Sequence, residues 1–107
     1  MKKTTYHIFF SNLASPLRVD IISQLRNKEM CVMEISKSLR VEQSKLSHAL
    51  SGLRECNLVN VKQKGKKRVY SLNKKTLIPI LRIIDKHSRS YCGGNCSTCL
   101  IKHPIKR

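Results

Sequence analysis

Three cysteines close to the end of the sequence are its strongest candidates for chemistry. Cys92, Cys96 and Cys99 follow one another with C-x3-C-x2-C spacing, and His103 comes four residues later. The two glycines after Cys92 allow the chain to turn tightly, so the three thiolates can converge on one ion. A structural zinc ion takes four sulfur or nitrogen ligands in a tetrahedron, and Cys3His with His103 supplies that set within one chain. Zinc, or another thiophilic divalent ion, is therefore the first choice of cofactor.

The same cysteines are compatible with other roles. An iron-sulfur cluster used as a redox or iron sensor is the alternative cofactor, because such clusters are held by closely spaced thiolates. The fourth ligand could equally be His87 or a residue of a partner chain. A bare thiol switch with reversible disulfides is a third possibility, and a tail whose cysteines have no function is a fourth. Enzymes that hold a cluster with this spacing need a domain of roughly 200 residues, which this chain cannot contain.

The charge balance points to a polyanionic partner. The sequence has 22 Lys and Arg against 6 Asp and Glu, a formal net charge of +16, which is more than solubility requires. Nucleic acid is the first candidate. The 107 residues are enough for one domain with one modest core, and they show no acid–base pair or nucleophile constellation. We therefore predict that the protein is not an enzyme.

The sequence favours a cytoplasmic protein. The first residues superficially resemble a secretory signal, but His7 and Asn12 interrupt the apolar run, which is shorter than the roughly 7 residues that such a signal needs. No stretch approaches the roughly 20 apolar residues of a membrane span, so no membrane partner is expected. In the cytoplasm thiols stay reduced, and clustered cysteines more often bind metal or sense redox state than form structural disulfides.

The hydrophobic pattern predicts a mainly α-helical fold with one small β-hairpin. Apolar residues recur at helical spacing in five segments, and Ser15 followed by Pro16 is a typical helix start. Two segments instead alternate with a period of two, which is typical of strands. The predicted helices cover residues 3–14, 15–28, 32–39, 41–57 and 73–91, and the predicted strands cover 58–63 and 68–72, joined by a turn at Gly65.

Two short helices followed by a basic hairpin form a winged helix-turn-helix, which binds DNA. The helix at 41–57 has an apolar stripe made of Leu46, Ala49, Leu50 and Leu53, and polar residues on its other sides. The candidate DNA-binding residues are Gln43, Ser44, Lys45, Ser47 and His48 on this helix, and Lys64, Lys66, Lys67 and Arg68 on the hairpin. A charged hairpin is often only solvated surface, but its place after a helix-turn-helix in so basic a chain favours DNA contact.

The first and last predicted helices carry more apolar surface than a small domain can cover. The helix at 3–14 has an aromatic face with Tyr6, Phe9 and Phe10, and the helix at 73–91 is apolar on more than one side. We expect these two helices to form a homodimer interface. Residues 1–90 are then a winged helix DNA-binding and dimerisation domain, and residues 91–107 are a Cys-rich metal- or cluster-binding loop with a basic tail.

Residues 13–72, and more loosely 5–90, resemble the ArsR/SmtB family of metal- and redox-responsive repressors. The segments that carry the resemblance are "LASPLRVDIISQL", "VMEISKSLRVEQSKLSHALSGLRECNLV" and "VKQKGKKRVYSL". The resemblance implies a homodimer built on the first and last helices, which binds a roughly palindromic double-stranded DNA operator and is released by an inducer. One departure is Glu42, which stands where the family usually has a serine or threonine. Its carboxylate can still favour the helix N-terminus electrostatically, but it is also expected to lie near phosphate and to weaken or shift the docking.

The family's usual sensor positions are only partly present. Many members carry Cys-Val-Cys at the third helix, whereas here Cys31 is followed by Met33, a neutral ligand that suits cuprous copper alone. Cys31 and Cys56 are therefore expected to be small buried hydrophobic residues. Asp85 and His87 match the beginning of a second sensor pattern whose remainder is absent.

Together these features predict a DNA-binding transcriptional regulator, a repressor by resemblance. Its DNA affinity would be modulated by a metal ion or an iron-sulfur cluster at the C-terminal cysteines. The alternative is a non-specific architectural DNA- or RNA-binding protein with a structural zinc.

Overall fold

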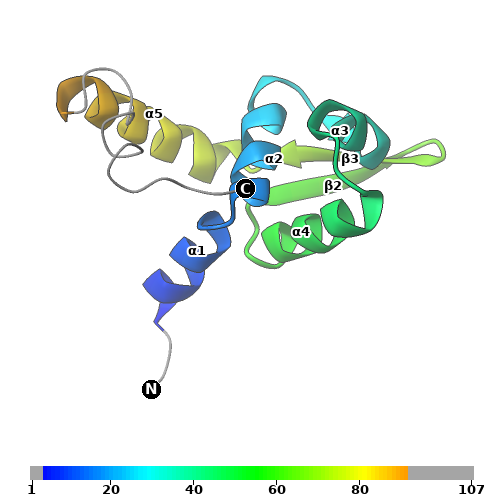
Figure 1. Cartoon of the computed structure of the whole chain (residues 1–107), viewed down its shortest axis with the longest axis horizontal. Coiled ribbons are helices and arrows are strands. Elements are labelled where there is room, and N and C mark those ends of the chain that lie inside the picture. Colours follow the sequence, from blue (N-terminus) through cyan, green and yellow to red (C-terminus); the bar gives the residue numbers. More distant parts are fainter. Residues whose placement is uncertain (1–3, 92–107) are drawn as a thin grey trace. The chain divides into compact units, whose positions relative to one another are not determined.

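The computed structural model describes residues 4–91 and divides the chain into two units, Met1–Asn73 and Lys74–Arg107. The elements of the first unit are α1 (Thr5–Leu13), α2 (Pro16–Asn27), β1 (Met30–Cys31), α3 (Val32–Leu39), α4 (Gln43–Glu55), β2 (Val59–Lys64) and β3 (Lys67–Leu72). In the second unit the structure describes α5 (Lys74–Tyr91) (Figure 1).

The four predicted helices of the first unit are present, although α1 and α4 each begin two residues later than the ranges predicted from residues 3 and 41. Thr4 caps α1, and its hydroxyl accepts a hydrogen bond from the backbone N–H of His7. Ser15 caps α2 by accepting from the backbone N–H of Arg18, and Pro16 occupies the first helical position, where no backbone donor is needed. The predicted Ser-Pro start is therefore confirmed, and α3 has the predicted bounds.

The strands form a three-stranded antiparallel sheet with the order β1-β3-β2, and β1 comes between α2 and α3 in the sequence. In the β2–β3 hairpin the register runs from Val59 opposite Leu72 to Lys64 opposite Lys67. Gly65 has a φ of 62°, a left-handed conformation that glycine adopts without strain and that suits a two-residue hairpin turn. The strand β1 was not predicted, because two residues carry no periodicity and β1 exists only through its pairing with β3.

The core of the first unit is formed where α2, α3 and α4 pack together and against the sheet. The apolar stripe predicted for α4 is buried, with Leu46, Leu50 and Leu53 each fully inaccessible. The other large buried side chains of this unit are Ile21, Ile22, Leu25, Met30, Ile35, Leu58, Tyr70 and Leu72. This core holds α4 with its polar side toward solvent, and the β2–β3 hairpin extends beyond the helices (Figure 1).

The first helix, α1, has no buried residue, and Tyr6 and Phe10 are 76% and 64% exposed. The ring of Phe9 packs edge-on against Phe10, at 5.6 Å between centroids, so the aromatic residues form one apolar patch. Such a patch on a small domain is typical of an interaction surface. The predicted homodimer interface on this helix remains a prediction.

The last helix, α5, is continuous. It contains Pro79, where the sequence allowed either a kink or a later helix start, and it begins at Lys74, before the proline. Ile83 and Ile84 are 69% and 51% exposed, which agrees with the prediction that this helix is apolar on more than one side. No helix within residues 4–91 is long and apolar enough to cross a bilayer.

Candidate nucleic-acid interface

The turn between α3 and α4 is held by two hydrogen bonds at Ser36. The backbone N–H of Val41 donates to the Ser36 carbonyl at 3.2 Å, and the Ser36 hydroxyl donates to the Val41 carbonyl at 2.6 Å. Arg40 ends α3 in a left-handed conformation with φ 56°. This turn fixes the direction in which α4 leaves α3, and hence which residues α4 presents to a ligand.

The start of α3 is stabilised by Glu34. The backbone N–H of Cys31 donates to the Glu34 carboxylate at 3.0 Å. This hydrogen bond, followed by one from the Cys31 thiol and by the positive charges of Lys28 and Lys67, lowers the pKa of Glu34. Cys31 is buried, as predicted, and is the N-cap residue of α3. Met33, the second residue of the partial Cys-x-Met motif, is 56% exposed on the surface.

The polar side of α4 faces solvent. All five candidate residues of this helix are exposed: Gln43, Ser44, Lys45, Ser47 and His48. Glu42 is the N-cap residue of α4, and its side chain makes no capping hydrogen bond. It therefore does not supply the cap that a serine or threonine would provide at this position. The exposed groups include amide, hydroxyl, ammonium and imidazole donors, which suit contacts to base edges and phosphates.

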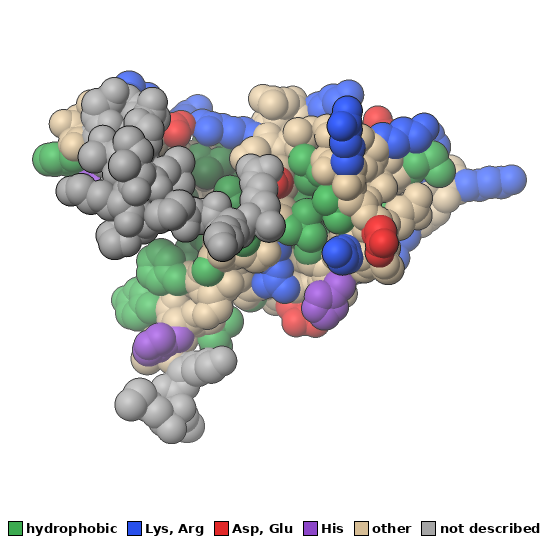
Figure 2. All heavy atoms as spheres, viewed as in Figure 1, with side chains coloured by type: hydrophobic (Ala, Val, Ile, Leu, Met, Phe, Trp, Pro, Cys, Tyr) green, Lys and Arg blue, Asp and Glu red, His purple; other side chains and the backbone are tan. Residues whose placement is uncertain are grey.

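The end of the β2–β3 hairpin is basic and exposed. Lys64, Lys66, Lys67 and Arg68 are all exposed, and Figure 2 shows basic side chains reaching the hairpin tip. Lys64 differs from its neighbours because its ammonium group forms an ion pair with the carboxylate of Glu29. Sequence reasoning missed this pair, since the two residues are 35 positions apart.

Arg18, in α2, connects α1 with the C-terminal half of α4. Its Nη1 donates to Oδ1 of Asn12, and Nδ2 of Asn12 donates to the thiol sulfur of Cys56. Cys56 is half-buried, and is thus less enclosed than the sequence predicted. The guanidinium passes over Gly52, where an added Cβ would overlap Nη2 and lie 2.7 Å from Cζ. A glycine inside a helix lowers helix stability by about 1 kcal/mol relative to alanine. Gly52 was therefore the one local sign in the sequence that another side chain lies close to α4 there.

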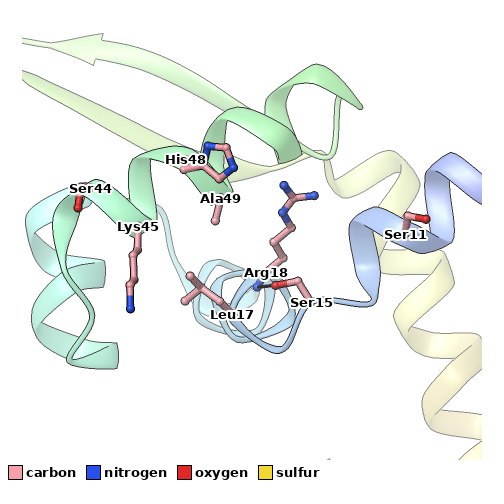
Figure 3. A pocket seen from close by; sticks show the side chains of 8 residues that line it. All are labelled: Ser11, Ser15, Leu17, Arg18, Ser44, Lys45, His48 and Ala49. Atoms are coloured by element: carbon pink, nitrogen blue, oxygen red, sulfur yellow. Dashed lines mark hydrogen bonds between the residues drawn. The ribbon is translucent and has the colours of Figure 1, made fainter. Parts of the chain in front are cut away.

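Beside Arg18 the surface has a hollow of about 600 Å³. Figure 3 shows its lining side chains, which come from α1, from α2 and its N-cap Ser15, and from α4. The polar ones are Ser11, Ser15, Arg18, Ser44, Lys45 and His48, and the apolar ones are Leu17 and Ala49. Three candidate DNA-binding residues of α4 therefore border the hollow.

The candidate metal ligands come last in the sequence. Cys92, Cys96, Cys99 and His103 lie outside the described residues. Among residues 4–91, no group of three or more His, Cys, Asp and Glu side chains could hold a metal ion. His87 lies against the ring of Tyr91, at 4.9 Å between centroids.

Known proteins of one family are similar to this chain. A family model described as "Bacterial regulatory protein, arsR family" matches residues 15–61. The "Transcriptional repressor SmtB homolog" of Synechocystis is 34% identical over 79 residues, which are 74% of this chain and 60% of that protein. The "Arsenical resistance operon repressor" of Staphylococcus xylosus is 30% identical over 84 residues, which are 78% of this chain and 81% of the repressor. The chain spans 60% of the Synechocystis protein and 50% of the regulator NmtR of Mycobacterium tuberculosis.

Solved structures share the fold. Reduced HlyU from Vibrio cholerae superposes with a TM-score of 0.64 at 29% identity, over 79% of this chain and 86% of HlyU. NolR from Sinorhizobium fredii gives a TM-score of 0.70 at 28% identity, over 85% of this chain and 97% of NolR. The predicted winged helix-turn-helix fold is thus confirmed. The matching proteins are regulators and not enzymes, as the sequence predicted. The chain belongs to the arsR family of bacterial regulatory proteins.

Proposed function

We propose that this protein is a DNA-binding transcriptional regulator that represses transcription. The observation that carries the proposal is the joint exposure of the polar side of α4 and the basic hairpin within one unit. In a winged helix-turn-helix, α4 enters the major groove and reads base edges, while the hairpin contacts phosphates nearby. Repression is favoured because relatives from Synechocystis and Staphylococcus xylosus are named repressors, although HlyU of Vibrio cholerae is named an activator.

The regulator acts as a homodimer on a roughly palindromic double-stranded operator. The exposed aromatic patch of α1 and the exposed isoleucines of α5 supply apolar surface for a second copy. A twofold dimer presents two copies of α4, which must lie about 34 Å apart to enter successive major grooves. This spacing makes operator binding sensitive to any change at the dimer interface.

DNA selection followed by binding measurements tests the proposal. The wild-type protein is used to select sequences from a random duplex library, and fluorescence anisotropy then compares the selected duplex with a scrambled one at several salt concentrations. We expect a palindromic selected site, bound at least about 10³-fold more tightly than scrambled DNA. Gln43→Ala should reduce this preference, because it removes a group that can read a base edge.

Equal affinity for selected, scrambled and RNA duplexes would instead support a non-specific architectural protein. Such binding would still weaken strongly with salt, because phosphate contacts alone produce that dependence. The ratio of specific to non-specific affinity therefore separates the two functions, whereas affinity alone does not.

A metal ion or cluster at the C-terminal cysteines modulates the affinity for DNA. Cys92, Cys96 and Cys99 with His103 would hold zinc, and the three cysteines could alternatively hold an iron-sulfur cluster. The donor set of three thiolates and one imidazole fits zinc without further ligands. The first of these cysteines follows the last residue of α5 directly, so filling the site changes how α5 can pack in the dimer. By linkage, DNA changes the affinity for the ligand by the same factor.

The cofactor is identified by preparing the protein without oxygen and measuring metal, acid-labile sulfide and visible absorption. About one zinc per chain without colour supports the zinc site, and a brown protein with iron and sulfide supports the cluster. Cys96→Ser should abolish the response of DNA binding to the ligand while leaving basal operator binding largely intact. Cys56→Ser is the matched control, because it also removes one thiol but leaves the C-terminal ligands complete. An unchanged ligand response in Cys96→Ser would contradict the sensor role.

A further inference from the structure

The hollow beside α4 has the lining of an anion site. It is bordered by three hydroxyl groups, from Ser11, Ser15 and Ser44, and by the cationic side chains of Arg18 and Lys45. His48 adds a further potential donor, and no carboxylate is among the lining residues. Hydroxyl, ammonium and guanidinium donors without a competing carboxylate are the groups that bind phosphate in proteins.

The position of Arg18 depends on Gly52. The three atoms nearest to a Cβ added at position 52 all belong to the Arg18 guanidinium. The backbone does not require glycine there, because Gly65 is the only glycine with positive φ among the residues that the structure describes. Glycine weakens a helix, so α4 gives up helical stability at the point where the guanidinium of Arg18 occupies the room of a side chain.

The guanidinium is oriented but not saturated. Asn12 accepts one hydrogen bond from Nη1, and a guanidinium has five N–H donors. Within residues 4–91 the side chain of Arg18 forms no ion pair, so its charge is not neutralised by a fixed carboxylate. An oriented guanidinium with free donors binds a phosphate with two parallel hydrogen bonds more readily than a mobile one does.

We propose that this hollow binds a backbone phosphate of the operator, and that Arg18 is a DNA-contacting residue outside the recognition helix and the wing. The inference rests on the proposed function. Ser44, Lys45 and His48 border the hollow and also belong to the predicted recognition face, so DNA that lies along α4 brings its backbone to the hollow (Figure 3). A phosphate contact fixes the position of the protein on the duplex and carries no sequence information.

Two variants test the inference by different routes. Arg18→Gln removes the charge, whereas Gly52→Ala keeps the charge and displaces the guanidinium with a single methyl group. Alanine is the better helix former, so Gly52→Ala should not lower the melting temperature. Arg54→Gln is the matched control, because Arg54 is an exposed arginine of α4 that does not border the hollow. Binding of the selected and scrambled duplexes is measured by anisotropy between about 50 and 200 mM salt.

We expect Arg18→Gln to weaken both duplexes by a similar factor, on the order of tenfold, because the variant cannot form charged hydrogen bonds to phosphate. The slope of log affinity against log salt should fall by about 0.9 for each phosphate that the variant no longer neutralises. Gly52→Ala should reproduce most of this weakening, and Arg54→Gln should change the affinity less than about twofold.

Wild-type affinity and salt slope in both Arg18→Gln and Gly52→Ala would overturn the inference. The proposed function would survive that result if the wild-type protein still prefers its selected duplex, so the two failures are distinguishable. Melting of the protein in millimolar inorganic phosphate, compared with chloride at equal ionic strength, separates the sources of phosphate. No change is expected, and a stabilisation that Arg18→Gln abolishes would assign the hollow to a free anion instead of DNA.

Discussion

The ion pair between Lys64 and Glu29 predicts that removal of the glutamate strengthens DNA binding. Lys64 belongs to the basic hairpin that we propose contacts phosphates, yet its ammonium group already pairs with the Glu29 carboxylate. A phosphate must compete with this carboxylate for the lysine. Glu29→Gln removes the competing charge and keeps the size of the side chain.

The structure limits how large the effect can be. The side chains of Lys64 and Glu29 are 54% and 48% exposed, so water and salt screen the pair. Exposed pairs of this kind contribute about 0.2–1 kcal/mol. Lys64 therefore gives up at most about 1 kcal/mol when it turns to a phosphate, which corresponds to at most about a fivefold gain in affinity for each half-site in Glu29→Gln. The free energy of unfolding should fall by no more than about 1 kcal/mol.

Anisotropy on the selected duplex measures the gain, and a double-mutant cycle assigns it. Glu29→Gln should have little effect in a Lys64→Gln background, because the pair no longer exists there. Glu55→Gln is the matched control, since Glu55 is an exposed glutamate near the end of α4 and its removal changes the net charge equally. The reasoning is refuted if Glu29→Gln and Glu55→Gln have the same effect, or if the gain persists without Lys64.

Three further predictions concern the helix-turn-helix. Arg40→Gly should raise the free energy of unfolding by about 0.5–1 kcal/mol, because Arg40 holds a left-handed φ that glycine adopts without strain; an unchanged or lower urea midpoint would contradict this. Glu42→Ser should raise the melting temperature through a new cap, with a gain of roughly 0.5–1 kcal/mol, and should also tighten DNA binding by removing a carboxylate beside α4. Glu34→Gln should be less stable than the wild type at neutral pH. The folded state lowers the pKa of Glu34, so its contribution is fully present above the ordinary value of 4.5 and is lost as the pH falls through the folded value. Urea midpoints at neutral and acid pH should therefore converge for the two proteins, and a constant difference would argue against this role of the carboxylate.

The helices and the hairpin were predictable because their signals are local. In α4 the buried leucines recur at helical spacing, and the Ser-Pro pair before α2 combines a cap with a first position that needs no backbone donor. The fold class and the candidate residues of α4 followed from these patterns. The strand β1 was missed, because Met30 and Cys31 become a strand only by pairing with Tyr70 and Val69 of β3.

The sequence alone determined which chemical groups this protein can offer. Its excess of lysine and arginine, the polar side of α4 and the spacing of the last cysteines are properties of residue types and short distances along the chain. Only the tertiary structure decided which of these groups are engaged. Lys64 meets Glu29, and Arg18 crosses Gly52 to reach Asn12, because packing of the core brings distant segments together. Such contacts depend on three-dimensional packing, which leaves no periodic trace in the order of the residues.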